Sequence, residues 1–131
     1  MIYLASAYYH ENETVREANY LNAMKAVHYF ALKGLPVFSP ILHFHELSKV
    51  HKLPKDHKFW RKLDEDYLSS CAELYVLCTD NWERSVGVQS ELIFADTNGI
   101  TPKFFRWNFE GRLIEIPRYK AISSFPDHES V

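Results

Sequence analysis

The sequence predicts a single-domain α/β protein with a doubly wound, mainly parallel five-stranded sheet, in the three-layer arrangement of flavodoxin-like and Rossmann-like folds. Short apolar runs alternate along the chain with longer segments of helical periodicity, which is the order that builds parallel sheets. The 131 residues, 47% of them hydrophobic, supply one core and leave little room for a second. In such sheets ligands bind beyond the carboxyl ends of the strands, so we expect the site there.

The first third of the chain predicts one β-α-β unit. Residues 1–6 form a short apolar run bounded by polar residues, typical of a strand buried on both faces. Thr14 and Glu17 stand three apart, as in a capping box, and predict a helix that ends at Gly34. Residues 36–40 predict a brief strand with a proline at each end, parallel to the first.

The rest of the chain continues the alternation. The predicted elements are a short helix with a loop over residues 41–54, a helix over 57–72, a strand over 73–79, a loop over 80–85, a helix over 86–98, and strands over 103–107 and 112–116. We expect the domain to span residues 1–120 and a polar C-terminal tail to span residues 121–131.

Composition excludes several functions. The chain has 15 basic and 17 acidic residues and a formal charge of −2, which argues against binding to a nucleic acid polymer. Without a long apolar stretch or a signal-peptide pattern, we expect a soluble, cytoplasmic protein with no membrane partner. Cys71 and Cys78 are seven apart, which is neither a zinc spacing nor a disulfide framework, so we expect reduced, half-buried core thiols.

Two carboxylates fall on apolar helix faces. On a helical wheel Glu91 lies in one arc with Val88 and Leu92, and Asp64 lies in one arc with aromatic and aliphatic residues of its own helix. A carboxylate that points into a hydrophobic core must form an ion pair, accept hydrogen bonds or have a raised pKa. Two such groups in one small domain indicate a site. The alternative is that they cap a neighbouring loop or pair with an arginine.

The histidines predict no metal centre. His43 and His45 form a His-x-His pair, and His10, His51 and His57 lie elsewhere in the same half of the chain. No acidic or cysteine partner stands at a ligand spacing, so we interpret them as solvated or hydrogen-bonding residues. We expect neither a metal nor another cofactor.

Four pieces of the sequence together resemble a known enzyme superfamily. They are residues 1–8, residues 34–41 followed by His43 and His45, residues 64–71, and residues 80–91. In order and spacing they are similar to the nucleoside 2-deoxyribosyltransferases and the related nucleoside 5′-monophosphate N-glycosidases, and closest to a small phage and bacterial branch. The similarity covers most of residues 1–105. Ala7 is a departure, because that branch usually carries proline there.

The resemblance implies a role for each matching residue. Glu91 corresponds to the nucleophile that attacks the anomeric carbon, and Asp64 to the second carboxylate, which orients the nucleophile or handles the proton of the departing base. Tyr8 corresponds to an aromatic or polar contact to the nucleotide and completes the predicted catalytic set. The predicted substrate-binding residues are Ser85, Gly87, Ser39, Ser6, His43 and Trp82.

The identity of residue 85, a serine, indicates which class of substrate the resemblance implies. Six residues before the nucleophile, the transferases acting on free nucleosides typically carry an aspartate, whereas the monophosphate hydrolases carry a serine. A serine hydroxyl beside Gly87 and the free N–H groups of a helix start can donate to a phosphate, which an aspartate would repel. A plain N-cap is the alternative role of Ser85, and both roles can coexist.

The sequence therefore predicts cleavage of the N-glycosidic bond of a 2-deoxynucleoside 5′-monophosphate, with water as the acceptor. The alternatives are base exchange between nucleosides, a nucleotide-binding module without turnover, and a metal-dependent hydrolase built on the histidines. The resemblance also implies a homo-oligomer, for which four aromatic residues could supply an interface: Phe104, Phe105, Trp107 and Phe109.

Overall fold

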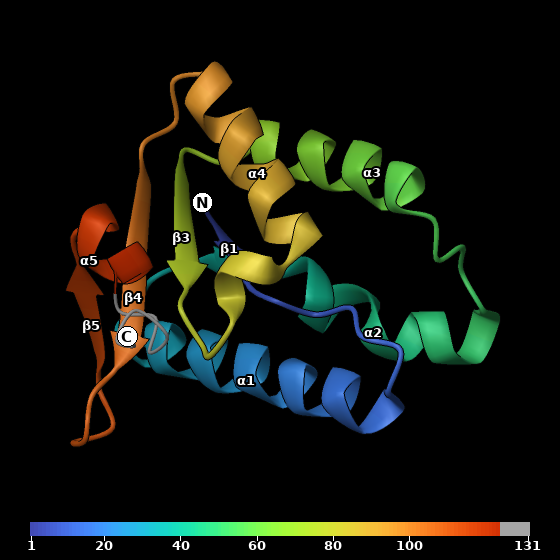
Figure 1. Cartoon of the computed structure of the whole chain (residues 1–131), viewed down its shortest axis with the longest axis horizontal. Coiled ribbons are helices and arrows are strands. Elements are labelled where there is room, and N and C mark those ends of the chain that lie inside the picture. The colour runs from blue at the N-terminus through green and yellow to red at the C-terminus, as the bar shows by residue number, and fades with distance from the viewer. Residues whose placement is uncertain (124–131) are drawn as a thin grey trace.

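The computed structural model describes residues 1–123 and shows the predicted α/β fold. Its five-stranded sheet has the order β2-β1-β3-β4-β5 (Figure 1). The first four strands are parallel and β5 is antiparallel to β4. Their bounds are Ile2–Ala5 for β1, Val37–Phe38 for β2, Glu73–Leu77 for β3, Pro102–Trp107 for β4 and Leu113–Ile116 for β5.

Helices cover both faces of the sheet. The bounds are Glu13–Leu32 for α1, Pro40–His51 for α2, His57–Ser69 for α3, Val86–Thr97 for α4 and Arg118–Ser123 for α5, with a 3₁₀ turn, η1, at Trp82–Arg84. Figure 1 shows α1 on one side of the strands and α3 and α4 on the other. Within residues 1–123, no helix combines the length and the apolar character that crossing a membrane requires.

Alternate residues along the strands point to opposite faces of the sheet, where they pack into two separate hydrophobic cores. Leu4 and Tyr75 point toward α1, where they pack with Phe30. Tyr3 and Val76 point toward α3 and α4, where the cluster also contains the free, buried thiols Cys71 and Cys78. The core position of both thiols agrees with the prediction, but they are buried rather than half-buried.

The position of the sheet's switch point follows from the strand order. The chain moves outward from β1 to β2 on one side and from β3 to β4 on the other. The segments that leave the carboxyl ends of β1 and β3, residues 6–12 and 78–85, therefore lie next to each other at one edge. This edge is where the sequence placed the ligand site.

Several element ends differ from the prediction. Helix α1 is capped by Asn12, whose side chain accepts a hydrogen bond from Thr14 N, so the predicted capping box at Thr14 is wrong. Pro40 begins α2 rather than ending a strand, because Ser39 caps that helix. Helix α5 extends into the predicted tail and buries Ala121 in the core. The remainder of that tail, residues 124–131, lies outside the described residues.

Candidate functional site

Helices α3 and α4 bring the two predicted carboxylates together. Asp64 of α3 and Glu91 of α4 line the same cavity of about 40 Å³, and α3 packs directly against α4. Gly87, at the start of α4, and Trp60, one turn before Asp64, also line it. The cavity has room for about one water molecule, so a larger ligand needs these walls to move apart.

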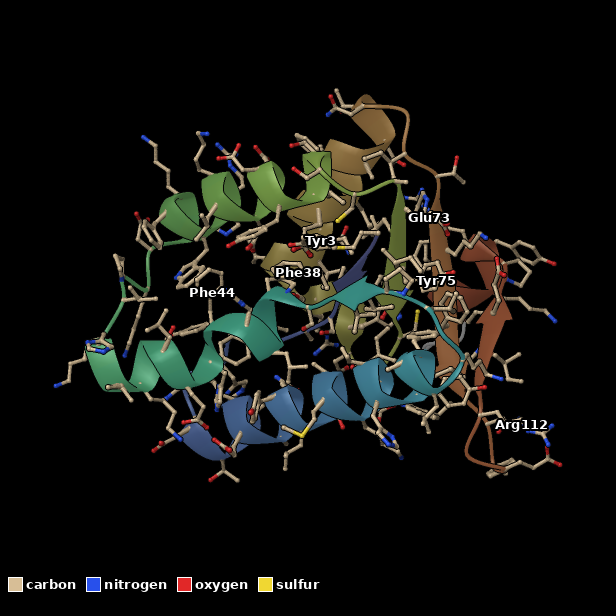
Figure 2. The ribbon with its side chains drawn as sticks, turned by 180° about the vertical axis from the view of Figure 1, so that it is seen from behind. Tyr3, Phe38, Phe44, Glu73, Tyr75 and Arg112 are labelled. Atoms are coloured by element: carbon tan, nitrogen blue, oxygen red, sulfur yellow. The ribbon has the colours of Figure 1, made fainter. Side chains whose placement is uncertain are left out.

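Glu91 is held by a residue that sequence reasoning missed. Its side chain is only 6% exposed, and its Oε2 accepts a hydrogen bond from the hydroxyl of Tyr3. Tyr3 is fully buried in the middle of β1, 88 positions away in sequence. The one available signal was a phenol within an otherwise aliphatic strand (Figure 2).

Burial controls the protonation of the carboxylate pair. Burial raises the pKa of Asp64 to about 7. Burial is the main cause and the negative charge of Asp64 the second cause that raise the pKa of Glu91 to about 8. The hydrogen bond from Tyr3 lowers the pKa of Glu91. Burial also raises the pKa of Tyr3 well above its usual value, so the phenol keeps its proton and remains a donor. Near neutral pH the pair therefore retains a proton that ordinary carboxylates would have lost.

Asp64 has an unused oxygen. Its Oδ1 is buried and has no hydrogen-bond partner among the described residues. A buried polar atom without a partner is unfavourable and is uncommon in folded proteins. A protonated Asp64 that faces a ligand or a water molecule would remove this cost.

The start of α4 provides hydrogen-bond donors beside the carboxylates. Ser85 is the N-cap of this helix, and its Oγ accepts from Val88 N at 3.2 Å. Because the cap uses a lone pair, the Ser85 O–H proton stays available for donation. A side chain at Gly87 would meet only Ser85 Oγ, at 3.9 Å, so the surface here is open. The capping role and the binding role predicted for Ser85 are compatible.

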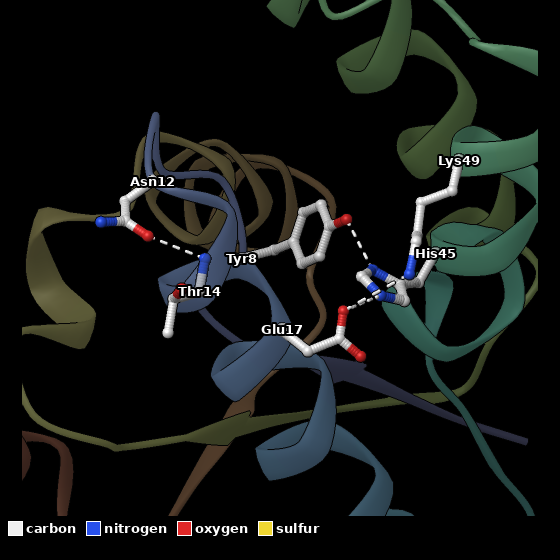
Figure 3. Close-up of polar contacts among 6 residues, drawn as sticks. All are labelled: Tyr8, Asn12, Thr14, Glu17, His45 and Lys49. Carbon is white, nitrogen blue, oxygen red and sulfur yellow. Dashed lines mark hydrogen bonds and ion pairs between the residues drawn. The ribbon is translucent and has the colours of Figure 1, made fainter.

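The carboxyl end of β1 carries a second polar group. Tyr8 Oη lies 2.8 Å from His45 Nδ1, and His45 Nε2 lies 3.0 Å from Glu17 Oε1 (Figure 3). Ser6 is buried, and its Oγ has no partner among the described residues. Ser39 caps α2 through a bond from Leu42 N. The predicted strand-end residues Ser6, Tyr8 and Ser39 thus follow two adjacent strands.

Trp82 is placed differently from expectation, whereas His43 remains a predicted substrate contact. Trp82 is 3% exposed, and its ring packs in the core against Phe104, so it offers no open face for a base. The exposed His43 lies with its ring 5.7 Å from that of Phe38. Between α2 and α3, the ring of Phe44 contacts that of Trp60, which lines the cavity with Asp64.

One group of metal-ligand type is present within residues 1–123, and it was not predicted. Glu17, His45 and Glu46 place their ligand atoms within 4.8 Å of one another. Both His45 nitrogens are engaged by Tyr8 and Glu17, and Lys49 Nζ lies 3.6 Å from the Glu17 carboxylate. A nearby ammonium opposes cation binding, so we interpret the group as a hydrogen-bond network.

Comparison with known protein families identifies a match. Residues 1–106 match the model of a family described as "Domain of unknown function (DUF1937)". No curated protein is significantly similar to the chain. The matched range contains every candidate site residue described above and ends within β4.

Proposed function

The chain belongs to the DUF1937 family, and we propose that this member cleaves the N-glycosidic bond of a 2-deoxynucleoside 5′-monophosphate, with water as the acceptor. The observation that carries the proposal is the carboxylate pair of the buried Glu91 and the half-buried Asp64, which line one cavity, together with the phenol of Tyr3 that donates to Glu91. Enzymes that cleave glycosidic bonds through a covalent intermediate usually use two carboxylates in different environments as their catalytic residues.

In the first step Glu91 acts as the nucleophile. Tyr3 occupies Oε2, which leaves Oε1 to attack C1′ of the sugar. The C1′–N bond breaks, its electron pair leaves with the base, and an ester forms between C1′ and Glu91. Because the pKa of Glu91, about 8, lies above that of Asp64, about 7, the proton of the pair resides mainly on Glu91 near neutral pH. The reaction uses the minor form in which Glu91 is ionised and Asp64 is protonated, and the hydrogen bond from Tyr3 favours the ionised Glu91.

Asp64 supplies and recovers the proton. In its protonated form it donates to the nitrogen of the departing base and becomes a carboxylate. A water molecule then attacks C1′, the ester bond to Glu91 breaks, and Asp64 takes the proton released by the water. The products are the free base and 2-deoxyribose 5-phosphate. The raised pKa of Asp64, about 7, suits a group that both gives and takes a proton near neutral pH.

The start of α4 favours a monophosphate over a free nucleoside. Ser85 has a hydroxyl proton to donate, and the first N–H groups of α4 lack partners within the helix. The positive end of the helix dipole further favours an anion. A carboxylate in place of Ser85 would repel a phosphate, so this residue supports the monophosphate as substrate.

A chromatographic assay tests the proposal. The protein is incubated with each 2-deoxynucleoside 5′-monophosphate and each matching nucleoside, with and without a second free base. We expect the base to be released from a monophosphate. Glu91→Gln should lower the rate by a factor on the order of 10³ or more, and Asp64→Asn by about 10²–10⁴.

Two exposed carboxylates serve as matched controls. Asp66→Asn lies on the same helix as Asp64, and Glu110→Gln changes a side chain that is 71% exposed. Both should keep the activity of the unmodified protein. A new nucleoside that forms only with added base would indicate base exchange instead. Binding of nucleotides without any product would contradict the proposal and favour a nucleotide-binding module.

A further inference from the structure

Three side chains near the end of β1 form a hydrogen-bonded chain that the proposed reaction does not use. Tyr8 contacts His45 Nδ1, and His45 Nε2 contacts Glu17, over distances of 2.8 and 3.0 Å (Figure 3). The three come from the segment after β1, from α2 and from α1. Asn19 Nδ2 donates to the Tyr8 carbonyl at 2.9 Å, which fixes the backbone beneath the phenol.

The imidazole at the centre of this chain is tightly packed. His45 is 3% exposed, and its ring stacks on that of Tyr20 at 4.0 Å with an angle of 16° between the planes. The Tyr8 ring meets the imidazole edge-on, at 88°. Turning the imidazole over would break both hydrogen bonds, so the packing fixes which nitrogen faces which partner.

For a neutral imidazole, the partners also fix the direction of each hydrogen bond. The bond from His45 lowers the pKa of Glu17, so Glu17 is a carboxylate and can only accept. His45 Nε2 must then carry the hydrogen, and in a neutral ring Nδ1 has only a lone pair. In this neutral tautomer Tyr8 donates to Nδ1. Burial raises the pKa of Tyr8, so the phenol keeps the proton that it donates.

The consequence for Tyr8 is that it has no further hydrogen to donate. The residue is half-buried and follows the carboxyl end of β1. Two positions earlier, the buried hydroxyl of Ser6 has no partner among residues 1–123. Both observations point to a polar ligand group, or a water molecule, beyond the end of β1.

We propose that Tyr8 Oη accepts a hydrogen bond from a donor group of the nucleotide, a sugar hydroxyl or an exocyclic amine, and that His45 and Glu17 are positioning residues that keep it an acceptor. This subsite rests on the proposed nucleotide substrate. It would discriminate against ligands that present an acceptor or an apolar group at the same place, because two acceptors facing each other lose a hydrogen bond.

The tautomer of His45 is the first test. Long-range ¹H–¹⁵N NMR spectra of the labelled protein report which ring nitrogen is protonated, and His45→Phe identifies the signals. We expect a neutral ring with hydrogen on Nε2. Hydrogen on Nδ1 alone, or on both nitrogens, would overturn the proposal, since Tyr8 would then accept from the imidazole.

Ligand discrimination is the second test. Calorimetric titrations use Glu91→Gln protein, in which the ligand stays intact, with 2-deoxyadenosine 5′-monophosphate, its 3-deoxy analogue, and the analogue whose base lacks the amino group. One of the two analogues should bind about tenfold more weakly than the parent, the usual worth of one hydrogen bond. The analogue affected identifies the sugar or the base as the donor.

Two substitutions test whether the difference in affinity between the nucleotides depends on the hydrogen bonds among Tyr8, His45 and Glu17. Adding Tyr8→Phe should make the parent and the affected analogue bind equally. His45→Phe keeps a ring against Tyr20 but frees the Tyr8 hydroxyl to donate, and it should reduce the discrimination as well. Tyr29→Phe, in the core on α1, is the matched control and should retain the full difference.

The outcomes separate this subsite from the proposed function. If Tyr8→Phe weakens the parent and both analogues by the same factor, or changes nothing, the subsite is wrong while the proposed reaction stands. If neither the unmodified protein nor Glu91→Gln binds any of the three nucleotides, the proposed function is wrong, and the subsite is overturned with it.

Discussion

The hydrogen bond from Tyr3 to Glu91 makes a prediction for the pH dependence of activity. The bond lowers the pKa of Glu91, so Tyr3→Phe should raise it further. The acidic limb of the pH profile of kcat/KM should then move up by about one to two pH units, the worth of a hydrogen bond to a charged group. Steady-state rates from pH 5 to 10 measure the shift.

A second tyrosine provides the control for that experiment. Tyr75 is buried in β3 on the opposite face of the sheet, toward α1. Tyr75→Phe should therefore leave the profile of kcat/KM in place. An unchanged acidic limb in Tyr3→Phe would show that Glu91 does not titrate in the rate profile.

The raised pKa of Glu91 also predicts a gain in stability when its charge is removed. In the unfolded chain this carboxyl has an ordinary pKa, whereas folding raises it to about 8. Its contribution is therefore most favourable at low pH and is lost as the pH rises from about 4.5 through 8. We expect Glu91→Gln to increase the free energy of unfolding by about 1–3 kcal/mol at pH 9.

Urea denaturation at pH 5 and pH 9 measures this effect. The gain should be small at pH 5, where Glu91 is already protonated in the folded protein. Glu110→Gln, at an exposed position, should show no such dependence on pH. A variant less stable than the unmodified protein at pH 9 would contradict the electrostatic account of the site.

Not every residue of the site was predictable from the sequence. Helical spacing alone places Asp64 and Glu91 on apolar faces, because both follow the period of their own helices. The partners Tyr3 and Glu17 were missed, since their bonds to Glu91 and His45 join positions 88 and 28 apart. Both contacts arise when a strand packs against a helix, or when two helices pack together. The periodicity of one element along the sequence does not predict such contacts.

Among the elements, α4 makes a prediction that separates capping from binding. Ser85→Ala removes the N-cap and should cost about 1 kcal/mol of stability. It should also raise KM for a monophosphate by about tenfold and leave KM for the matching nucleoside unchanged. Asn12→Ala, which uncaps α1, should cost similar stability without affecting the ratio of the two KM values.

Thermal unfolding and initial rates on the two substrates give both quantities. Equal increases of KM for monophosphate and nucleoside in Ser85→Ala would contradict a phosphate contact. They would leave Ser85 with its capping role alone.

The order of elements was predictable, while their ends were less so. Apolar runs and helical periods identified the five strands and the four longer helices found within residues 1–123. Asn12 and Thr14 are both good capping residues, so the sequence could not tell which of them starts α1. Pro40 suits a strand end as well as a first helical position, and only the bond from Leu42 N to Ser39 distinguishes them.

For the whole molecule, the expected homo-oligomer remains a prediction. Of the four aromatic residues that could form its interface, Phe104 and Phe105 are core residues and the Trp107 ring packs on that of Tyr29 at 5.4 Å. Phe109 is fully exposed. Sedimentation equilibrium should give a dimer or a larger assembly, whereas a mass of 15.4 kDa would contradict the expectation.

The two borders of the sheet differ in how readily they could recruit another chain. β2 is a border strand of two residues between Pro36 and the helical Pro40, and neither proline has an N–H to offer. β5, at the other border, is four residues long and free of proline. Any fibril or swapped dimer that grows by strand addition should therefore start at β5. In the antiparallel register the exposed Glu115 lies at a position whose N–H points away from β4, so a proline introduced at Glu115 would be the substitution of choice for suppressing aggregation during expression.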